Sequence, residues 1–193
     1  GLLAGSVAAL IAWRLFSHVQ TRVLAWSDPF SVIEKEGYQV SQSLFAIGTG
    51  GWFGLGLGQG MPYKIPVVEE DFIFAAIAEE FGILFAIFLI FVYMSCFYMI
   101  LNIAICLKDA YYKLIAVGLG TLVTFQVFLS IGGVIKFIPS TGVTLPFISY
   151  GGSSLLGMFC IWAIIQGMYL KRSDEVTEHG EDKKNKKAKK TRN

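Results

Sequence analysis

Five carboxylates lie within twelve residues in the middle of the chain: Glu69, Glu70, Asp71, Glu79 and Glu80. A stretch of 25 residues without a charge follows at 83–107, which is long enough to cross a membrane. Acidic side chains at the mouth of a span are costly unless they face water, a cavity or a partner, so this cluster predicts a functional site. A carboxylate at such a boundary can have a raised pKa, which suits a general base.

Asp71 is the strongest candidate for that base because it directly precedes the apolar segment Phe72-Ile73-Phe74-Ala75. The structural alternative is that Asp71 caps the N-terminus of the following helix. Glu69 and Glu70 are also explained as solvated acids that suit the positive end of a helix. We expect Glu79 and Glu80 to make structural hydrogen bonds or ion pairs.

Seven glycines occupy residues 48–60, and Gly54, Gly56, Gly58 and Gly60 alternate with larger residues. No recognisable βαβ unit surrounds this glycine block, which argues against a nucleotide-binding loop. Glycines let backbone N–H groups come close to an anion or to another backbone. The block is therefore either a flexible linker or a wall of the site, and the aromatic pair Trp52-Phe53 favours the wall.

The composition is that of a membrane protein. Hydrophobic residues make up 54% of the 193 residues without counting 21 glycines, above the roughly 45–50% of soluble domains. The apolar runs predict an all-α integral membrane protein with about four spans, near 1–13, 83–107, 114–135 and 154–170. Because the chain begins at Gly1 inside an apolar run, we expect a fragment of a longer protein. The three cysteines argue against a disulfide frame or a zinc site by count and spacing.

The charge distribution predicts the orientation in the membrane. Residues 171–193 carry nine Lys/Arg and five Asp/Glu, whereas the rest of the chain carries seven basic and nine acidic residues. Cytoplasmic segments are enriched in Lys and Arg, so we expect 171–193 to be a disordered cytoplasmic tail that contacts membrane lipid rather than nucleic acid. Residues 14–71 and 136–153 then form the outer loops of a membrane domain covering 1–170.

The outer loop 14–71 is too long to lack structure of its own. Residues 17–26 and 38–47 have helical spacing of apolar and aromatic side chains, so we expect two short interfacial helices separated by a turn at Asp28-Pro29. The second outer loop contains Pro139, Gly142, Pro146 and the pair Gly151-Gly152, which fix an irregular backbone. Such a backbone is tolerated where it lines a wet cavity or is buried in protein, so we expect this loop beside Asp71.

The segment from Thr141 to Leu155, TGVTLPFISYGGSSL, strongly resembles the signature of the SEDS family of shape, elongation, division and sporulation proteins, such as RodA and FtsW. Further agreement comes in the same order along the chain, from Asp28-Pro29 with 37–39 and 42–43, from 50–56, and from 71–75 with 79–82. The resemblance covers nearly all of the chain except the tail. It implies the last four helices of a ten-helix bundle.

The resemblance implies a peptidoglycan glycosyltransferase of the bacterial cytoplasmic membrane that serves cell shape, division or sporulation. Such enzymes polymerise lipid II, an undecaprenyl-diphosphate-linked disaccharide-pentapeptide, into glycan strands at the outer face of the membrane. They work with a class B penicillin-binding protein, which is a transpeptidase. The family's essential aspartate directly precedes Phe-Ile-Phe-Ala, which implies Asp71 as the catalytic residue here.

Transfer of a sugar from a diphosphate also requires stabilisation of the leaving group. The candidates are Arg22, Lys64 and Lys136, with the backbone N–H groups of Gly54 and Gly56. Further substrate contacts are expected from Gln39, Gln42, Glu70, Ser149, Tyr150 and Ser153. A divalent cation, Mg²⁺ or Mn²⁺, held by Asp71 and Glu70 is the alternative to a base that acts without metal.

Two positions depart from the pattern of the family. Glu69-Glu70 stand where the family has His-Thr before the aspartate, and Lys136 stands where small or apolar residues are common. Two other functions remain open, a transporter that flips the lipid-linked precursor and a non-catalytic scaffold for a penicillin-binding protein. A transporter needs polar groups at mid-membrane, where this chain offers Thr124, Gln126 and Ser130. Its polar residues gather in the outer loop instead, which favours chemistry at the interface.

Overall fold

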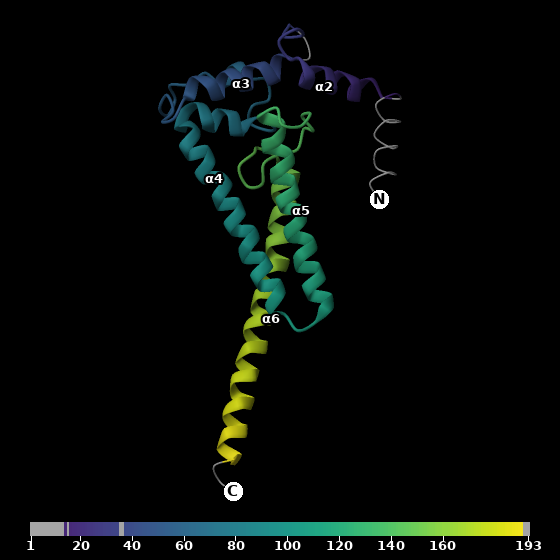
Figure 1. The fold of residues 1–193 in the computed structure, drawn as a ribbon, viewed down its shortest axis with the longest axis vertical. Helices are drawn as coiled ribbons and strands as arrows, with labels where there is room; N and C mark the ends of the chain where they lie inside the picture. The colour runs from purple at the N-terminus through teal and green to yellow at the C-terminus, as the bar shows by residue number, and fades with distance from the viewer. Residues whose placement is uncertain (1–13, 15, 35–36, 191–193) are drawn as a thin grey trace. The chain divides into compact units, whose positions relative to one another are not determined.

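The computed structural model describes residues 14, 16–34 and 37–190, and within these residues there are helices and turns but no strand. The helices are α2 (Ser17–Ser27), α3 (Tyr38–Gly50), η1 (Pro62–Lys64), α4 (Ile73–Cys106), α5 (Ala110–Val134) and α6 (Gly152–Lys190) (Figure 1). The all-α prediction is confirmed for this part of the chain. The predicted span at 1–13 lies outside the described residues.

Three of the described helices are long and apolar enough to cross a membrane: Ile73–Cys106, Ala110–Val134 and Gly152–Ser173. Helix α4 is in fact two helices that join at Gly82, where φ is 85° and ψ is 170°. The second of them covers 83–106 and matches the span predicted at 83–107. Only 11% of the most apolar window of α4 is buried, as expected for a surface that lipid or further helices cover.

Residues 91–125 and α6 form one compact unit. Its core consists of Ile100, Ile103, Ala104 and Leu107 of α4 and the following turn, Ala116 of α5, and Ile165 and Met168 of α6. Small residues allow the helix backbones to approach closely. At Gly120, for example, a Cβ would lie 2.8 Å from Cγ2 of Ile100. Lys171 donates to the carboxylate of Asp109 at 2.8 Å, which fastens the end of the last span to the turn between α4 and α5.

Helix α6 continues to Lys190, through most of the segment that the sequence predicts to be a disordered tail. The physical reason is that this segment has no proline and is rich in Lys and Glu, which are good helix formers. The membrane span supplies an existing helix end, so the segment avoids the cost of nucleation. The cytoplasmic location of the segment remains a prediction.

The other unit contains α2, α3, the glycine block, η1, the start of α4, the end of α5 and the loop after α5. Helices α2 and α3 confirm the two short helices predicted in the outer loop, and the turn at Asp28-Pro29 separates them. Ser41 and Ser43 of α3 are fully buried. Ser43 Oγ lies 3.3 Å from the carbonyl oxygen of Val134, so α3 packs against the end of α5.

The glycine block packs against the break in α4. Ile83 N donates to Gly51 O at 2.9 Å, and Leu55 N and Gly56 N donate to the carbonyl oxygens of Glu79 and Glu80 at 2.9 and 3.0 Å. A Cβ on Gly82 would lie 2.5 Å from Gly54 N, so two backbones touch where side chains would not fit. The block therefore satisfies the backbone groups that the break in α4 leaves free.

Candidate active site

Asp71 lies at the end of a series of turns, two residues before α4 begins. The side chains that follow it anchor this position, since Phe72 is 2% exposed and Phe74 and Ala75 are also buried. Within the described chain, no N–H group donates a hydrogen bond to the Asp71 carboxylate, which removes the helix-cap explanation. Val67, in the preceding turns, has a φ of 55°, a left-handed conformation that is rare for a β-branched residue and clusters at functional sites.

Arg22 of α2 reaches the same place from the other end of the outer loop. Its Nη1 donates to Ser140 O at 2.8 Å. A Cβ built on Gly142 would lie 3.3 Å from Asp71 Oδ2 and 3.4 Å from Arg22 Nη2. The carboxylate and the guanidinium therefore converge on Gly142, whose φ of +70° is one that glycine adopts without strain.

Three effects act on the pKa of Asp71. Burial raises this pKa above its ordinary value of 3.8, the charge of Glu70 raises it further, and the charge of Arg22 lowers it. A carboxylate with a raised pKa is a stronger proton acceptor than an ordinary aspartate. The departure from the family pattern at Glu70 therefore acts in the direction that a general base requires.

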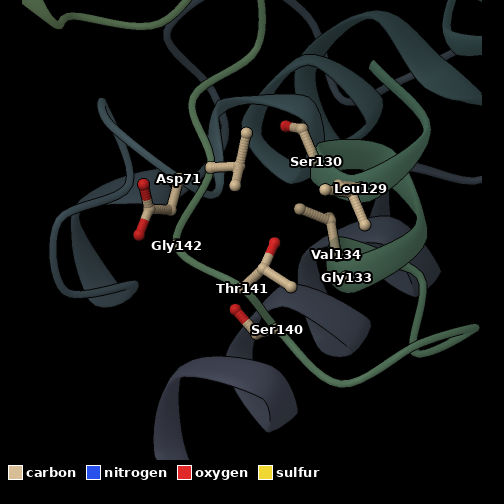
Figure 2. A pocket seen from close by; sticks show the side chains of 9 residues that line it. Asp71, Leu129, Ser130, Gly133, Val134, Ser140, Thr141 and Gly142 are labelled. Atoms are coloured by element: carbon tan, nitrogen blue, oxygen red, sulfur yellow. The ribbon is translucent and has the colours of Figure 1, made fainter. Parts of the chain in front are cut away.

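Asp71 lines a pocket with the end of α5 and the start of the second outer loop: Leu129, Ser130, Gly133, Val134 and 140–143. Figure 2 shows Asp71 beside Gly142 at one edge of the pocket and Ser130 across it. The second outer loop thus lies beside Asp71, as expected from its irregular backbone. The pocket itself is too narrow to admit a water molecule.

The rest of this loop also contacts the segment that carries Asp71. Tyr150 N donates to Glu69 O at 2.8 Å, while the Tyr150 side chain is exposed. Ser149 Oγ accepts a hydrogen bond from Leu145 N at 2.8 Å, which stabilises the turn. Ser149 and Tyr150 therefore lie in the same unit as Asp71. Ser153 lies in the first turn of α6 and belongs to the other unit.

Of the three cations considered for the diphosphate, Arg22 is the one that the structure brings to Asp71. Lys136 ties α2 to the second outer loop: its Nζ donates to Ser27 O at 3.3 Å, and its carbonyl oxygen accepts from Trp26 Nε1 at 3.1 Å. Lys64 of η1 is exposed and lines a different cavity. Sequence reasoning placed Arg22 beside the other cations without distinguishing it, because its approach to Asp71 depends on the packing of α2.

The N–H groups of Gly54 and Gly56 are used inside the protein. They donate to Gly50 O at 2.8 Å and to Glu80 O at 3.0 Å. The sequence allowed these N–H groups to approach either an anion or another backbone, and the structure shows that they approach another backbone. The side chains of Glu79 and Glu80 accept from Met61 N at 3.2 Å and Gly58 N at 3.1 Å, which confirms their expected structural hydrogen bonds.

The remaining expected site residues are distributed over α3. Gln39 Nε2 donates to Pro66 O at 3.1 Å and so holds the turn that leads to Asp71. Gln42 lines the same cavity as Lys64. Ser130, by contrast, lines the Asp71 pocket, and its buried Oγ has no hydrogen-bond partner among the described residues. The sequence did not predict that Ser130 lies at the Asp71 pocket, because there it is a single serine within an apolar run.

The donor set for a divalent cation is limited to two neighbouring carboxylates, Asp71 and Glu70. Among the described residues, no cluster of three or more His, Cys, Asp or Glu side chains forms. Mg²⁺ commonly binds through one or two carboxylates, with water and substrate phosphates completing its shell. The two residues present fit that mode of binding.

Comparison with known proteins gives this geometry its context. Residues 2–173 match the model of the cell cycle protein family named for FtsW, RodA and SpoVE. The peptidoglycan glycosyltransferase RodA of Mycobacterium tuberculosis (strain ATCC 25618 / H37Rv) is 42% identical over 165 residues, which cover 86% of this chain and 35% of that protein. The probable peptidoglycan glycosyltransferase FtsW of Bacillus subtilis (strain 168) is 47% identical over 156 residues, covering 76% of this chain and 38% of that protein. The chain thus spans little more than a third of the length of these relatives.

A solved structure shares the fold. It comes from a study of how a peptidoglycan synthase complex coordinates polymerization and crosslinking, and its TM-score is 0.66 at 24% sequence identity. The match covers 89% of this chain and 49% of that chain. The match of residues 2–173 to the family model shows that the chain belongs to the FtsW, RodA and SpoVE family of cell cycle proteins.

Proposed function

We propose that the protein to which this chain belongs is a peptidoglycan glycosyltransferase that polymerises lipid II at the outer face of the cytoplasmic membrane, with Asp71 as its catalytic base. The names of the relatives, peptidoglycan glycosyltransferase RodA and FtsW, support the activity. The observation that carries the proposal is the convergence of the Asp71 carboxylate and the Arg22 guanidinium on Gly142. One group accepts a proton there, and the other stabilises a developing negative charge.

The reaction follows from these two groups. Asp71 accepts the proton of the acceptor sugar hydroxyl as the hydroxyl oxygen forms a bond to the anomeric carbon of the donor. The bond between that carbon and the diphosphate oxygen breaks, and the diphosphate leaves with the electron pair. Arg22 Nη1 donates to Ser140 O, and Nη2, which lies beside Gly142, can donate to the leaving diphosphate.

A divalent cation would add positive charge at the same place. Asp71 and Glu70 would hold it together with diphosphate oxygens, and it would neutralise the leaving group. Chelation followed by addition of Mg²⁺ or Mn²⁺ distinguishes the two arrangements. A strict requirement for the cation supports ligation by these carboxylates, and indifference to chelation supports a base that acts without metal.

The polar groups of α5 favour this function over a lipid-linked precursor transporter. Thr124 Oγ1 donates to Gly120 O at 2.9 Å, inside its own helix. Gln126 Nε2 donates to Thr144 O at 3.1 Å, and therefore supports the second outer loop. Of the three polar side chains that a mid-membrane path would use, two are thus engaged in local structure.

The partner and the membrane orientation belong to the same proposal. The solved structure with the shared fold belongs to a study of a synthase complex that couples polymerization with crosslinking, which supports a transpeptidase partner of the class B penicillin-binding type.

Cysteines introduced at the exposed positions Ser31 and Ser173 test the orientation in intact cells. An impermeant thiol reagent is expected to label position 31 and not position 173. Labelling at 173 alone would reverse the topology.

The activity is tested with the full-length protein, purified together with its partner and supplied with lipid II. Asp71→Asn keeps the size of the side chain but removes the proton acceptor, so glycan polymerisation is expected to fall on the order of 10²–10⁴-fold. Glu34→Gln, on an exposed turn outside the site, is the matched control and should keep the parental rate. A folded, partner-bound Asp71→Asn protein that polymerises at near the parental rate would overturn the assignment.

A further inference from the structure

A second cavity lies in the same unit as Asp71, between α3 and the loop that joins the glycine block to η1. Its volume is about 240 Å³. Gln42, Phe45, Ala46 and Thr49 of α3 form one wall. The remaining lining residues are Leu55, Gln59, Met61, Lys64, Ile65 and Glu79. The exposed side chains of Gln59, Met61 and Lys64 show that the cavity opens to the surface.

One wall of this cavity is a buried carboxylate with an unused oxygen. Glu79 is 6% exposed, and its Oε1 accepts a hydrogen bond from Met61 N at 3.2 Å. Its Oε2 has no hydrogen-bond partner among the described residues. Leaving a buried carboxylate oxygen without a donor is costly, which makes Oε2 a candidate acceptor for a group that enters the cavity. A single water needs roughly 10–15 Å³, far less than the space present, so the cavity accommodates a larger donor.

The chemistry of the walls defines the class of ligand. Gln42, Gln59 and Thr49 supply neutral donors and acceptors, and Phe45, Leu55 and Ile65 supply apolar surface. Lys64 and Glu79 carry opposite charges, so the cavity has no net preference for an anion or a cation. A neutral ligand with several hydroxyl and amide groups and apolar ring faces satisfies all of these groups. Sugars of the N-acetylhexosamine type have this combination.

We propose that this cavity is a carbohydrate subsite that holds an N-acetylhexosamine unit of the glycan, with Glu79 Oε2 accepting a hydrogen bond from a sugar hydroxyl. This inference rests on the proposed function, since it assigns the subsite to the glycan acted on at Asp71. Ile65 lines the cavity, and six residues of chain reach at most ~20 Å, so Asp71 lies within reach of a short oligosaccharide bound there. Gln39 holds the connecting segment through Pro66 O.

The probe is the soluble β-1,4-linked tetramer of N-acetylglucosamine, added to the full-length protein with its partner and followed by ligand-observed NMR and calorimetric titration. Glu79→Gln keeps the acceptor for Met61 N but replaces one carboxylate oxygen with a donor NH₂ group. Gln59→Ala alters an exposed side chain, so its folding is not at risk. Each change should weaken tetramer binding by about tenfold, since one hydrogen bond to a ligand is worth on the order of 1 kcal/mol or more. Glu34→Gln is the matched control and should bind as the parental protein does.

The experiments can refute the carbohydrate subsite without refuting the proposed function, and the reverse. Asp71→Asn should lose polymerisation while it still binds the tetramer. Tetramer binding that depends on Glu79 in a protein without polymerase activity would sink the proposed function and keep the subsite as a glycan-binding site. Polymerisation that depends on Asp71, combined with tetramer binding that is absent or unchanged in Glu79→Gln and Gln59→Ala, would overturn the subsite alone.

Discussion

The carboxylate of Asp71 and the guanidinium of Arg22 both lie within 3.4 Å of the position that a Cβ of Gly142 would occupy. Three segments distant in sequence meet at this point: α2, the turn before α4 and the loop after α5. Arg22 is held there by its hydrogen bond to Ser140 O, two residues before Gly142. The loop therefore fixes the position of the guanidinium, and the charge of the guanidinium lowers the pKa of Asp71. Each part of this arrangement has a consequence that can be measured.

Gly142→Ala should impair activity more than it impairs folding. The new methyl group would crowd Asp71 Oδ2 at 3.3 Å and Arg22 Nη2 at 3.4 Å, and the φ of +70° costs a non-glycine residue roughly 1–2 kcal/mol. We expect a lower rate of lipid II polymerisation with the partner still bound. Gly157→Ala is the control, because nothing lies within 4 Å of its Cβ position. Equal activity of the two variants would contradict a close approach at Gly142.

Removing the charge of Glu70 should move the pH dependence of polymerisation to lower pH. The base acts in its ionised form, so the rate rises as pH passes through the pKa of Asp71. Glu70 raises that pKa, and Glu70→Gln therefore lets Asp71 ionise at lower pH. The measurement is the rate against pH between about pH 4 and 9, with the acid limb expected to shift downward.

Arg22→Gln should move the same limb in the opposite direction. Arg22 lowers the pKa of Asp71, so its removal raises the pH at which the base becomes active. The maximal rate should also fall, because the leaving diphosphate loses a charged donor. Shifts of the same sign in Glu70→Gln and Arg22→Gln would argue that Asp71 is not the group that titrates.

Gly82→Ala should destabilise the fold. Its φ is +85°, and a Cβ there would lie 2.5 Å from both Gly54 N and Trp52 O, so one of the two backbones has to move. The cost should be on the order of 1–3 kcal/mol, as for other overpacked sites. Gly48→Ala, in α3 with open space around it, should instead be neutral or stabilise by roughly 0.5–1 kcal/mol. Thermal unfolding of the purified full-length variants compares the two. A Gly82→Ala protein as stable as Gly48→Ala would exclude the close backbone contact.

The helices of this fold were predictable because each depends on a local pattern. The uncharged run at 83–107 gives the second part of α4 (83–106), and the helical spacing at 17–26 and 38–47 gives α2 and α3, each within a few residues. The break at Gly82 was not predicted, because the partner that stabilises it is the glycine block, which lies far away in the sequence. For the same reason the predicted contacts of Gly54 and Gly56 with substrate differ from their observed hydrogen bonds to backbone oxygens.

The sequence predicts a residue of the candidate site where the residues next to it along the chain indicate its role. Asp71 stands at the boundary between acidic and apolar residues, and burial together with Glu70 raises its pKa as that position suggests. Arg22 has no such neighbours, since its role comes from the approach of α2 to the second outer loop through Ser140 O. Backbone carbonyl oxygens of this kind leave no trace in a sequence.

Asp71→Asn should stabilise the fold at neutral pH while it removes activity. A pKa raised in the folded state means that the ionised carboxylate is disfavoured there. The folded protein then binds more protons than the unfolded chain between the ordinary value of 3.8 and the raised value, so stability falls as pH rises through that window. Asparagine carries no charge and avoids this loss. The Tm of Asp71→Asn should exceed that of the parental protein at pH 7–8, and the difference should vanish below about pH 3.8, where the parental aspartate is protonated in both states. Glu34→Gln, with an exposed side chain, should show no such trend. A lower Tm of Asp71→Asn at pH 7–8 would mean that the ionised carboxylate supports the fold, as a structural ion pair with Arg22 would, and would weaken its assignment as a strained catalytic group.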